Sequence, residues 1–260
     1  MSEINPYQPP SAHLSDVQEP SENGNFNLEG RTVSAGRGAE WLMAGLRLNF
    51  AQFVPWLLIG IVMVALMIVL SFIPLVNMVV SVCIPAITGG VVLAVRKQLA
   101  GEVVEVGDLF SGFREKGGPL MLVGVLYLAV TFGVVLVAMV IGGIGLFGAI
   151  ASGGEGWLTG LGIGVVVVMA LVAVLVGLAM YACIWLAPAL VVFHDVAPFE
   201  AMKRSFVVSM KNWLPLLVYG LLGMVFSVLA LIPLGLGWLI LMPAMMASTY
   251  FAYRDIFIED

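Results

Sequence analysis

Hydrophobic residues in this chain lie in long stretches without charge, and short charged segments separate these stretches. Residues 54–95 and 212–253 contain no Asp, Glu, Lys or Arg, and residues 117–192 contain one charged side chain, that of Glu155. About 20 apolar residues in a helix cross a bilayer core about 30 Å thick. Each stretch is therefore long enough for two membrane-spanning helices, and helices are expected because lipid cannot satisfy backbone polar groups.

Prolines and glycines divide the three stretches into spans. Pro74 and Pro233 mark turns in the first and last stretches, because proline interrupts helical hydrogen bonding. In the middle stretch a glycine-rich insert on the non-cytoplasmic side, at residues 142–164, separates two spans, and it can be a loop, a lid or a re-entrant segment. The six predicted spans are residues 55–73, 75–95, 119–141, 165–193, 214–232 and 234–253.

Composition indicates the same class of protein. Of the 260 residues, 61% are hydrophobic and 10% are charged, whereas about 25% of an average soluble domain is charged. A soluble protein with so few charges would expose large apolar patches. The composition excludes an ordinary soluble enzyme and a disordered chain, and the net charge of −5 argues against nucleic-acid binding. The predicted fold class is all-α integral membrane.

The positions of the 11 basic residues predict the orientation. All of them lie in segments that six spans place on one side of the membrane, and the connections on the other side contain none. By the positive-inside rule, both termini are expected in the cytoplasm. The basic residues are Arg31, Arg37, Arg47, Arg96, Lys97, Arg114, Lys116, Lys203, Arg204, Lys211 and Arg254.

An internal repeat relates the predicted hairpins. Three prolines and an arginine recur at closely similar spacing in the first and third hairpins, and the middle hairpin keeps part of the pattern with Pro119 and Pro188. Each copy begins and ends in the cytoplasm, so we expect three parallel-repeat hairpins around a pseudo-threefold axis along the membrane normal. The matching pairs are Pro55 with Pro215, Pro74 with Pro233, Pro85 with Pro243, and Arg96 with Arg254.

A short amphipathic segment precedes each hairpin, with apolar residues at steps of three and four. This spacing predicts helices that lie at the cytoplasmic membrane interface. The apolar positions are Leu42, Leu46, Phe50 and Phe53; then Leu109, Phe110 and Phe113; then Phe199, Met202, Phe206, Met210 and Trp213.

Polar residues beside these segments are candidate contacts with anionic lipid headgroups or with a protein partner. The alternative is that they are ordinary topology charges with no ligand. The candidates are Arg96, Lys97, Arg114, Lys116, His194, Lys203, Arg204 and Lys211.

These features divide the chain into four parts. Residues 1–35 form a predicted disordered cytoplasmic tail, and residues 36–96, 97–195 and 196–260 each contain one hairpin with the segment that precedes it. The tail motif Asn5-Pro6-Tyr7-Gln8-Pro9-Pro10 is expected to have polyproline character. It can dock on a cytoplasmic protein partner, or the tail can be a solvated leader.

Side chains for catalysis are scarce in the predicted spans. The spans contain no Asp, Glu, Lys, Arg or His, which argues against an intramembrane protease, a proton-coupled carrier and a redox enzyme. Cys83 and Cys183 lack metal-ligand spacing and are expected to pack as small apolar residues. His194 and Asp195 can form a headgroup-binding or pH-sensing site, or simply end a helix. We predict no catalytic residue, cofactor or metal site.

Several motifs resemble a family of uncharacterised proteobacterial six-span inner-membrane proteins. They are the tail motif at residues 5–10, Gly36-Arg37-Gly38 with Trp41, Phe110-Ser111-Gly112-Phe113-Arg114, and Ala201-Met202-Lys203-Arg204-Ser205-Phe206 with Asn212-Trp213. The last segment also resembles YciC-type proteins and the membrane domain attached to some glycerophosphodiester phosphodiesterases. The resemblance implies a multi-pass protein of the bacterial inner membrane, and no hydrolase activity is expected because the phosphodiesterase catalytic domain is absent.

Taken together, these observations predict a non-enzymatic inner-membrane protein that acts as a scaffold, regulator or assembly partner. The alternative is a transporter or lipid-handling protein with a site between the second, fourth and sixth spans, which we expect to be broken at Pro85, Pro188 and Pro243, where proline frees backbone carbonyls. A central cavity ringed by these prolines would favour the alternative. A dry core with an exposed basic platform would favour the scaffold.

Overall fold

The computed structural model describes residues 25–72, 76–151 and 160–259, and this part of the chain is almost entirely helical. Two short strands, β1 (Asn25–Phe26) and β2 (Ile258–Glu259), pair antiparallel. The helices are α1 (Arg37–Ala51), α2 (Phe53–Ser71), α3 (Val76–Leu99), η1 (Val106–Phe110), α4 (Ser111–Ala151), α5 (Gly160–Trp185), α6 (Ala187–His194), α7 (Pro198–Lys211), α8 (Trp213–Leu231) and α9 (Trp238–Phe257).

Five stretches of the described residues are long and apolar enough to cross a membrane. They overlap the first five spans predicted from the sequence, so an all-α protein with several candidate membrane-spanning helices is confirmed. The stretches are Phe53–Leu70, Met78–Leu99, Val106–Gly143, Val167–His194 and Trp213–Leu231.

The sixth predicted span, residues 234–253, corresponds to α9, which is not one of these five stretches. Polar side chains in its C-terminal half, among them Ser248, Thr249 and Tyr253, are buried. The helix packs against α1, α2, α3 and α8. A helix enclosed by other helices can carry polar groups that lipid would not accommodate. Helix α9 is therefore a central helix of the body.

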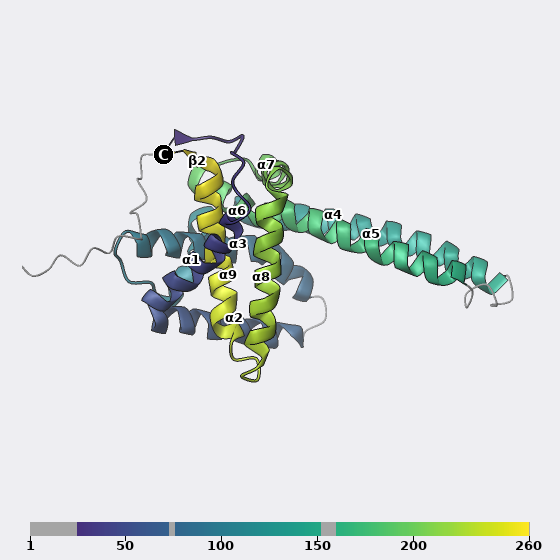
Figure 1. Ribbon diagram of the computed structural model, residues 1–260, viewed down its shortest axis with the longest axis horizontal. Coiled ribbons are helices and arrows are strands. Elements are labelled where there is room, and N and C mark those ends of the chain that lie inside the picture. Colours follow the sequence, from purple (N-terminus) through teal and green to yellow (C-terminus); the bar gives the residue numbers. More distant parts are fainter. Residues whose placement is uncertain (1–24, 73–75, 152–159, 260) are drawn as a thin grey trace, which may run out of the picture.

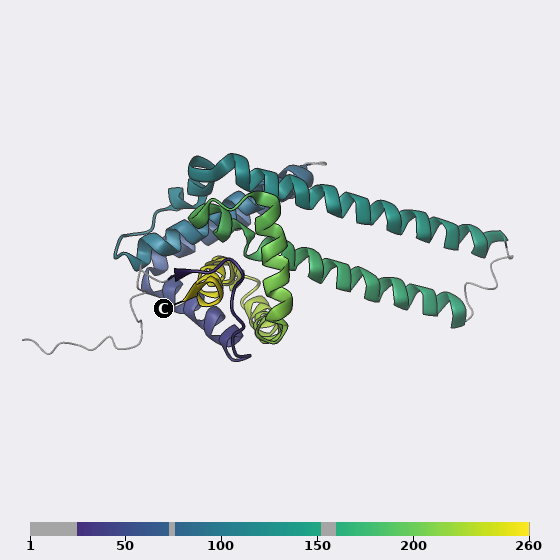
Figure 2. The same cartoon turned by 90° about the horizontal axis from the view of Figure 1, so that it is seen from above.

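The hairpins leave the body in different directions. Figure 1 shows α4 and α5 side by side, extending well beyond the body, while α8 and α9 run across that direction. The view from above in Figure 2 shows the same projection of the α4–α5 hairpin. Apolar side chains along this hairpin are exposed, among them Phe132, Met139, Leu175 and Leu178. Most of its described surface is therefore free to contact lipid.

The middle hairpin is longer than the sequence predicts. Helix α4 continues to Ala151 and α5 begins at Gly160, so both helices extend into the predicted insert at residues 142–164. Residues 152–159 lie outside the described part of the chain. A glycine weakens a helix by only about 1 kcal/mol, and backbone groups in lipid have few partners other than the helix itself.

Of the three candidate prolines, Pro188 alone lies at a break in its helix. Pro85 and Pro243 lie inside the continuous helices α3 and α9. A break at Leu186 separates α5 from α6, and Pro188 follows in the first turn of α6, where proline fits without losing a hydrogen bond. The expectation that prolines break all three helices is therefore corrected, because neighbouring groups and local adjustment accommodate a proline inside such a helix.

The turn of the third hairpin, which the sequence analysis placed at Pro233, extends over several residues. Helix α8 ends at Leu231 and α9 begins at Trp238, with Leu234 and Gly235 in left-handed backbone conformations at φ 55° and 83°. Such conformations reverse the chain within a few residues.

Residues 25–35, which the sequence assigns to a disordered tail, are held against the end of α9. The Asn27 amide donates to the Phe257 carbonyl and the Arg31 amide donates to the Ile256 carbonyl, both at 2.8 Å. This part of the tail prediction is corrected, because extended backbone can be ordered by hydrogen bonds that leave no periodic pattern in the sequence.

Helices α1 and α7 each carry two different apolar faces. One face packs against the body, and it includes Leu42 and Met202 of the predicted interfacial stripes, so the prediction is wrong for these two positions. Other members of the stripes stay exposed and suit a membrane interface. Members of the buried faces are Gly38, Trp41, Leu42, Gly45 and Leu48 in α1, and Ala201, Met202, Ser205 and Val208 in α7. Exposed members of the first stripe are Phe50 of α1 and Phe53 at the start of α2, and those of the third are Phe199 and Met210 of α7 and Trp213 at the start of α8. In the second stripe Phe110 is exposed, whereas Leu109 is buried.

Three close contacts join the hairpins in the same manner. In each case a small residue comes from the segment that precedes one hairpin. It lies against the second helix of another hairpin, close to a backbone carbonyl of that helix and to the backbone amide one turn later. The contacts are Gly45 with the Ala244 carbonyl and Ser248 amide, Gly112 with the Ala86 carbonyl and Gly90 amide, and Ser205 with the Ala182 carbonyl and Leu186 amide.

These contacts form a cycle. Helix α1 packs on α9, the start of α4 packs on α3, and α7 packs on α5, so that each hairpin is joined to the next and the third is joined to the first. Helices α3, α6 and α9 contact one another at the centre. The two helices of each hairpin contact each other less than they contact the neighbouring hairpins.

Candidate functional site

A pocket lies where helices of all three hairpins meet. Its cavity volume is about 210 Å³, and its wall is mostly apolar with a few hydroxyl groups. The lining residues are Ile84, Pro85 and Thr88 of α3; Tyr181, Ile184, Trp185 and Pro188 of α5 and α6; Tyr219 of α8; and Met245, Met246 and Thr249 of α9.

The structure brings two of the three candidate prolines to this pocket. Pro85 and Pro188 line it. Pro243 does not, but Met245 and Met246 of the following turn do. The walls of the pocket come from the second, fourth and sixth predicted spans and from Tyr219 of the fifth.

Most polar groups of the pocket have partners within the protein. The Tyr219 hydroxyl lies 2.8 Å from Ser248 Oγ and 3.1 Å from the Met245 carbonyl oxygen. The Thr88 hydroxyl donates to the Ile84 carbonyl at 3.0 Å. The buried Nε1 of Trp185 differs, because it has no hydrogen-bond partner among the described residues.

A second pocket, of about 420 Å³, lies at the C-terminal end of α3 and has charged walls. Arg96, Lys97, Glu102, Asp108 and Glu115 are among its lining residues. Lys97 Nζ lies 2.9 Å from Asp108 Oδ2. Both signs of charge are present, so this surface is not a simple site for anions.

The eight candidate contact residues all have partners within the chain. Several of these contacts join different segments of the chain, whereas Lys203 and Arg204 pair with Glu200 inside α7 and the Lys203 side chain stays 59% exposed. Arg96 lies over the Phe193 ring, Lys97 pairs with Asp108, Arg114 donates to the Gly107 carbonyl, Lys116 pairs with Asp195, His194 bonds to Tyr253, Lys203 and Arg204 pair with Glu200, and Lys211 donates to the Glu29 carbonyl.

His194 is held between aromatic rings. Its ring stacks on Phe26 of β1 with centroids 3.5 Å apart, and its Nε2 lies 2.5 Å from the Tyr253 hydroxyl. Asp195 ends α6 in a left-handed conformation at φ 53°. The contacts of His194 therefore connect β1 with α6 and α9.

Polar side chains at the three helix junctions clamp the segments that lead into the hairpins. Gln52 donates to the Glu102 carbonyl and accepts from the Val104 amide, both at 2.8 Å. Asn212 makes the same pair of bonds to the Arg31 carbonyl at 3.1 Å and the Val33 amide at 2.8 Å. The third junction is a kink inside α4, where Lys116 has non-helical backbone angles (φ −137°, ψ 34°), and Lys116 pairs with Asp195. The clamps run in the same cyclic order as the helix contacts.

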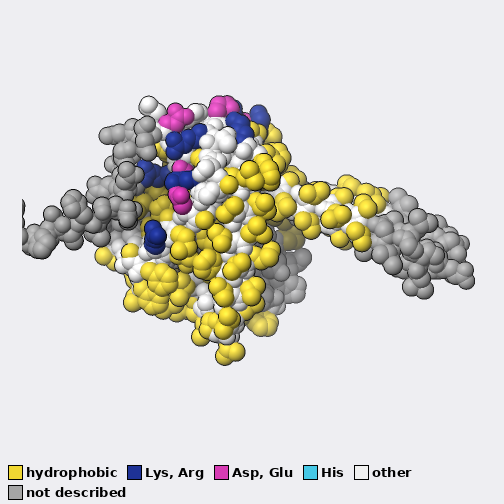
Figure 3. Space-filling model, viewed as in Figure 1, with side chains coloured by type: hydrophobic (Ala, Val, Ile, Leu, Met, Phe, Trp, Pro, Cys, Tyr) yellow, Lys and Arg dark blue, Asp and Glu magenta, His cyan; other side chains and the backbone are white. Residues whose placement is uncertain are grey.

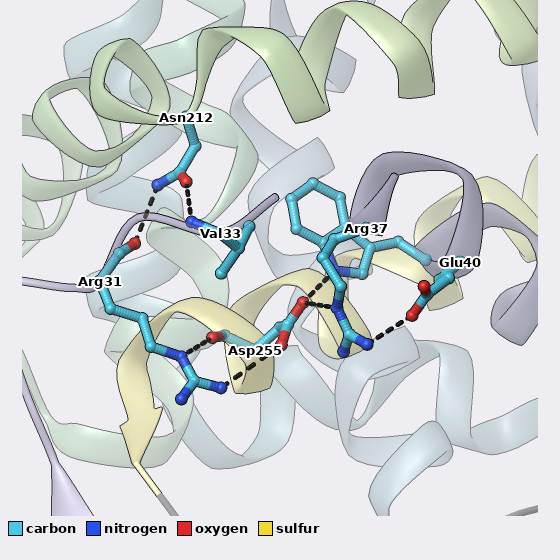
Figure 4. A network of polar contacts seen from close by, with 7 residues as sticks. Arg31, Val33, Arg37, Glu40, Asn212 and Asp255 are labelled. Carbon is cyan, nitrogen blue, oxygen red and sulfur yellow. Dashed lines mark hydrogen bonds and ion pairs between the residues drawn. The ribbon is translucent and has the colours of Figure 1, made fainter. Parts of the chain in front are cut away.

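At this end of the body the Asp255 carboxylate joins several polar side chains (Figure 4), and its own side chain is 8% exposed. It accepts from Arg37 Nε at 2.5 Å and from Trp41 Nε1 at 2.9 Å, and Arg31 Nε donates to the Asp255 carbonyl at 2.6 Å. Hydrogen bonding to Asp255 raises the pKa of Arg37. Glu40 also contacts Arg37 but is largely exposed.

Charge and apolar surface are segregated over the molecule. In Figure 3, Lys, Arg, Asp and Glu gather around the end of the body that carries α7 and β2, whereas hydrophobic side chains cover the α8 side and the α4–α5 hairpin. Near this charged end, Arg204 lowers the pKa of Glu200 through a hydrogen bond.

Sequence reasoning missed Gln52, Asn212, Asp255 and Trp185 as residues with specific roles. A signal for the clamps is present in the sequence, because Gln52, Lys116 and Asn212 each stand three residues before the proline that opens a hairpin. No such signal marks Trp185, whose position in the pocket depends on the break after α5.

Comparisons with known proteins support the membrane assignment. A family model described as "Domain of unknown function (DUF7847)" matches residues 42–258. A protein of Burkholderia thailandensis named "Probable inner membrane protein" is 30% identical over 233 residues, which cover 84% of this chain and 82% of that protein. No solved structure matches the chain.

Proposed function

This chain belongs to the DUF7847 family, and we propose that it is an inner-membrane protein that binds a lipid or another apolar membrane component where its three hairpins meet. The pocket between α3, α5, α6, α8 and α9 is the observation that carries this proposal. The name of the Burkholderia relative supports the inner membrane as the location. The role is non-enzymatic, and no catalytic residue is assigned.

The proposed arrangement has six spans in three parallel-repeat hairpins, with α9 as the sixth span and both termini in the cytoplasm. The cycle of helix contacts and the matching clamps at Gln52 and Asn212 support a pseudo-threefold relation between the hairpins. Helix α9 is less apolar than the other spans because much of its surface faces protein. Kinship with YciC-type proteins and with the phosphodiesterase membrane domain stays a hypothesis.

The size and lining of the pocket define the class of ligand. A volume of about 210 Å³ is smaller than the roughly 300–1,000 Å³ of sites that enclose a whole small molecule. It suits part of an elongated molecule, such as the beginning of an acyl chain, with the remainder lying between the diverging hairpins. An apolar wall favours such a segment over a hydrated solute.

Filling the pocket tests the proposal. Ile184→Phe adds volume at the pocket wall, and we expect this variant to lose a lipid that the unaltered protein retains. Val168→Phe is the matched control, because Val168 lies on an exposed face of α5, and it should retain the lipid. Native mass spectrometry of protein released from nanodiscs of known lipid composition measures retention, and thermal unfolding checks that both variants fold. Equal retention by the two variants contradicts the proposal.

A scaffold or assembly role is the second candidate, favoured by the exposed apolar surface of the projecting α4–α5 hairpin. A protein partner can cover this surface within the membrane, or dock on the tail motif at residues 5–10 in the cytoplasm. Anionic lipids are proposed contacts at the charged end of the body.

Deletion of residues 1–24 tests the tail as a docking segment, because it keeps residues 25–35 that bind α9. Under the scaffold hypothesis, this deletion is expected to abolish crosslinking of the partner while leaving membrane insertion intact. Quantitative mass spectrometry of crosslinked complexes, with a variant that scrambles residues 11–24 as control, measures the change. Unchanged crosslinking in the deletion variant rules out the tail as the docking segment.

A further inference from the structure

The hydroxyl of Thr249 in α9 makes no hydrogen bond with the described residues, although Thr249 is only 3% exposed. Hydroxyl side chains inside membrane helices usually donate to the carbonyl four residues earlier. Thr88, Thr131 and Ser227 do so, at 3.0, 2.8 and 2.7 Å. Thr249 is therefore an exception, and a buried hydroxyl without a partner is unfavourable.

The packing of α9 against α8 explains why this hydroxyl is unpaired. The carbonyl four residues before Thr249 is that of Met245, and its oxygen already accepts from other groups. Ser248 Oγ lies 2.6 Å from this oxygen, and the Tyr219 hydroxyl lies 3.1 Å from it. A carbonyl oxygen has two lone pairs, so neither is left for Thr249.

The pocket is the space that is open to the Thr249 hydroxyl. Among the described residues, Nε1 of Trp185 is the unpaired side-chain atom that the protein encloses completely. The Thr249 hydroxyl is unpaired without being enclosed in this way, and Thr249 forms part of the pocket wall. A molecule that touches Thr249 from within the pocket can therefore supply the missing partner.

A second threonine gives the pocket a hydrogen-bond acceptor. Thr88 of α3 also lines the pocket, and its hydroxyl proton is already used, because it donates to the Ile84 carbonyl. A hydroxyl oxygen has two lone pairs besides its proton, so Thr88 can still accept a hydrogen bond. The mostly apolar wall thus contains one available donor, at Thr249, and one available acceptor, at Thr88.

From these observations, and resting on the proposed function, we infer that the ligand of the pocket is an apolar alcohol, such as a long-chain alcohol or a glyceride with a free hydroxyl group. Its hydroxyl accepts a hydrogen bond from Thr249 and donates one to Thr88. An ether or ester oxygen can only accept, so it would use Thr249 alone. The chain attached to the hydroxyl lies along the apolar part of the wall, which includes Ile184 and Met246.

The test compares three probes with the same alkyl chain: a primary alcohol, its methyl ether and the plain hydrocarbon. The alcohol donates and accepts, the ether only accepts, and the hydrocarbon does neither. In nanodiscs containing equal amounts of the three, native mass spectrometry should show the alcohol retained in about fivefold preference over the ether, as expected for one hydrogen bond, and the hydrocarbon retained least. Equal retention of the three probes by the unaltered protein overturns the inference, and this comparison needs no variant.

Thr249→Val isolates the donor, because it removes the hydroxyl with little change in the shape of the side chain. This variant should retain the ether and the hydrocarbon equally. Thr131→Val is the matched control, since the Thr131 hydroxyl donates within α4 and Thr131 is not part of the pocket wall, and it should keep the preference for the ether. Thermal unfolding checks that both variants fold.

The outcomes separate this inference from the proposed function. A preference for the ether that is unchanged in Thr249→Val overturns the inference. If the unaltered protein retains none of the three probes, or if Ile184→Phe leaves the retention of every probe unchanged, the proposed function fails instead.

Discussion

Replacement of Gly112 by alanine is expected to lower the free energy of unfolding by about 3 kcal/mol or more. A Cβ atom at this position would lie 2.0 Å from the Ala86 carbonyl oxygen and 2.7 Å from the Gly90 amide nitrogen of α3. Both atoms belong to the backbone, so no side-chain rotation can relieve the overlap. Helices α3 and α4 would have to separate, and chemical unfolding in detergent, followed by circular dichroism, measures the loss.

Gly133→Ala is the matched control for this prediction. Gly133 lies in α4 beyond the kink at Lys116, and a Cβ atom there meets nothing within 4 Å. Because alanine favours a helix over glycine by up to about 1 kcal/mol, this variant should be as stable as the unaltered protein or slightly more stable. Equal destabilisation by the two substitutions would show that the α3–α4 contact does not depend on the small residue.

The second large effect is expected at Asp255. Asp255→Asn keeps the shape of the side chain but removes the charge that pairs with Arg37 and the full acceptor strength toward Trp41. Removing one partner from a buried ion pair is costly because the other group loses its compensation. Arg37 is partly exposed, so we expect a loss of about 2 kcal/mol rather than the larger values of fully buried pairs. The same unfolding measurement gives the change in free energy.

Glu40→Gln serves as the control for Asp255→Asn, since both acids contact the same guanidinium. The Glu40 side chain is 61% exposed, against 8% for Asp255. An exposed ion pair contributes at most about 1 kcal/mol, so this variant should change stability little. If the two variants lose the same stability, burial of Asp255 does not explain its role.

The apolar stretches could be predicted from the sequence because each consists of consecutive residues, and the repeat could be predicted because it compares spacings within two such stretches. A long stretch without charge can cross lipid in few conformations, of which the helix is the usual one. The spacing of Pro55, Pro85 and their counterparts is visible without a structure. The exposed aromatic positions around the ends of α1 and α7 were also visible. Periodicity could not show that the buried face, with Gly45 or Ser205, also takes Leu42 and Met202 from the predicted stripes, because neighbouring faces of a helix repeat with the same period.

The central pocket and the buried position of α9 could not be predicted from the sequence, because both depend on how the helices pack in three dimensions. Residues 234–253 lack charge, as a lipid-facing span does, and only the packing shows that Ser248 and Thr249 are buried by other helices. The pocket depends on Trp185 standing beside a helix break at Leu186 and facing residues far away in sequence, such as Tyr219. Contacts between residues so far apart in the sequence cannot be predicted from local patterns.

The cyclic order of contacts has a consequence for biosynthesis. Helix α1 is translated first, but the helix that it packs against, α9, is translated last. Contacts between segments so far apart form late, because the intervening chain must first be synthesised and ordered. Only then can these contacts offset the conformational entropy lost in ordering it. The first hairpin must therefore enter the bilayer with its glycine-lined docking helix unmatched. A ribosome stalled before α9 would leave a nascent chain whose assembly cannot close, however well its earlier spans have inserted.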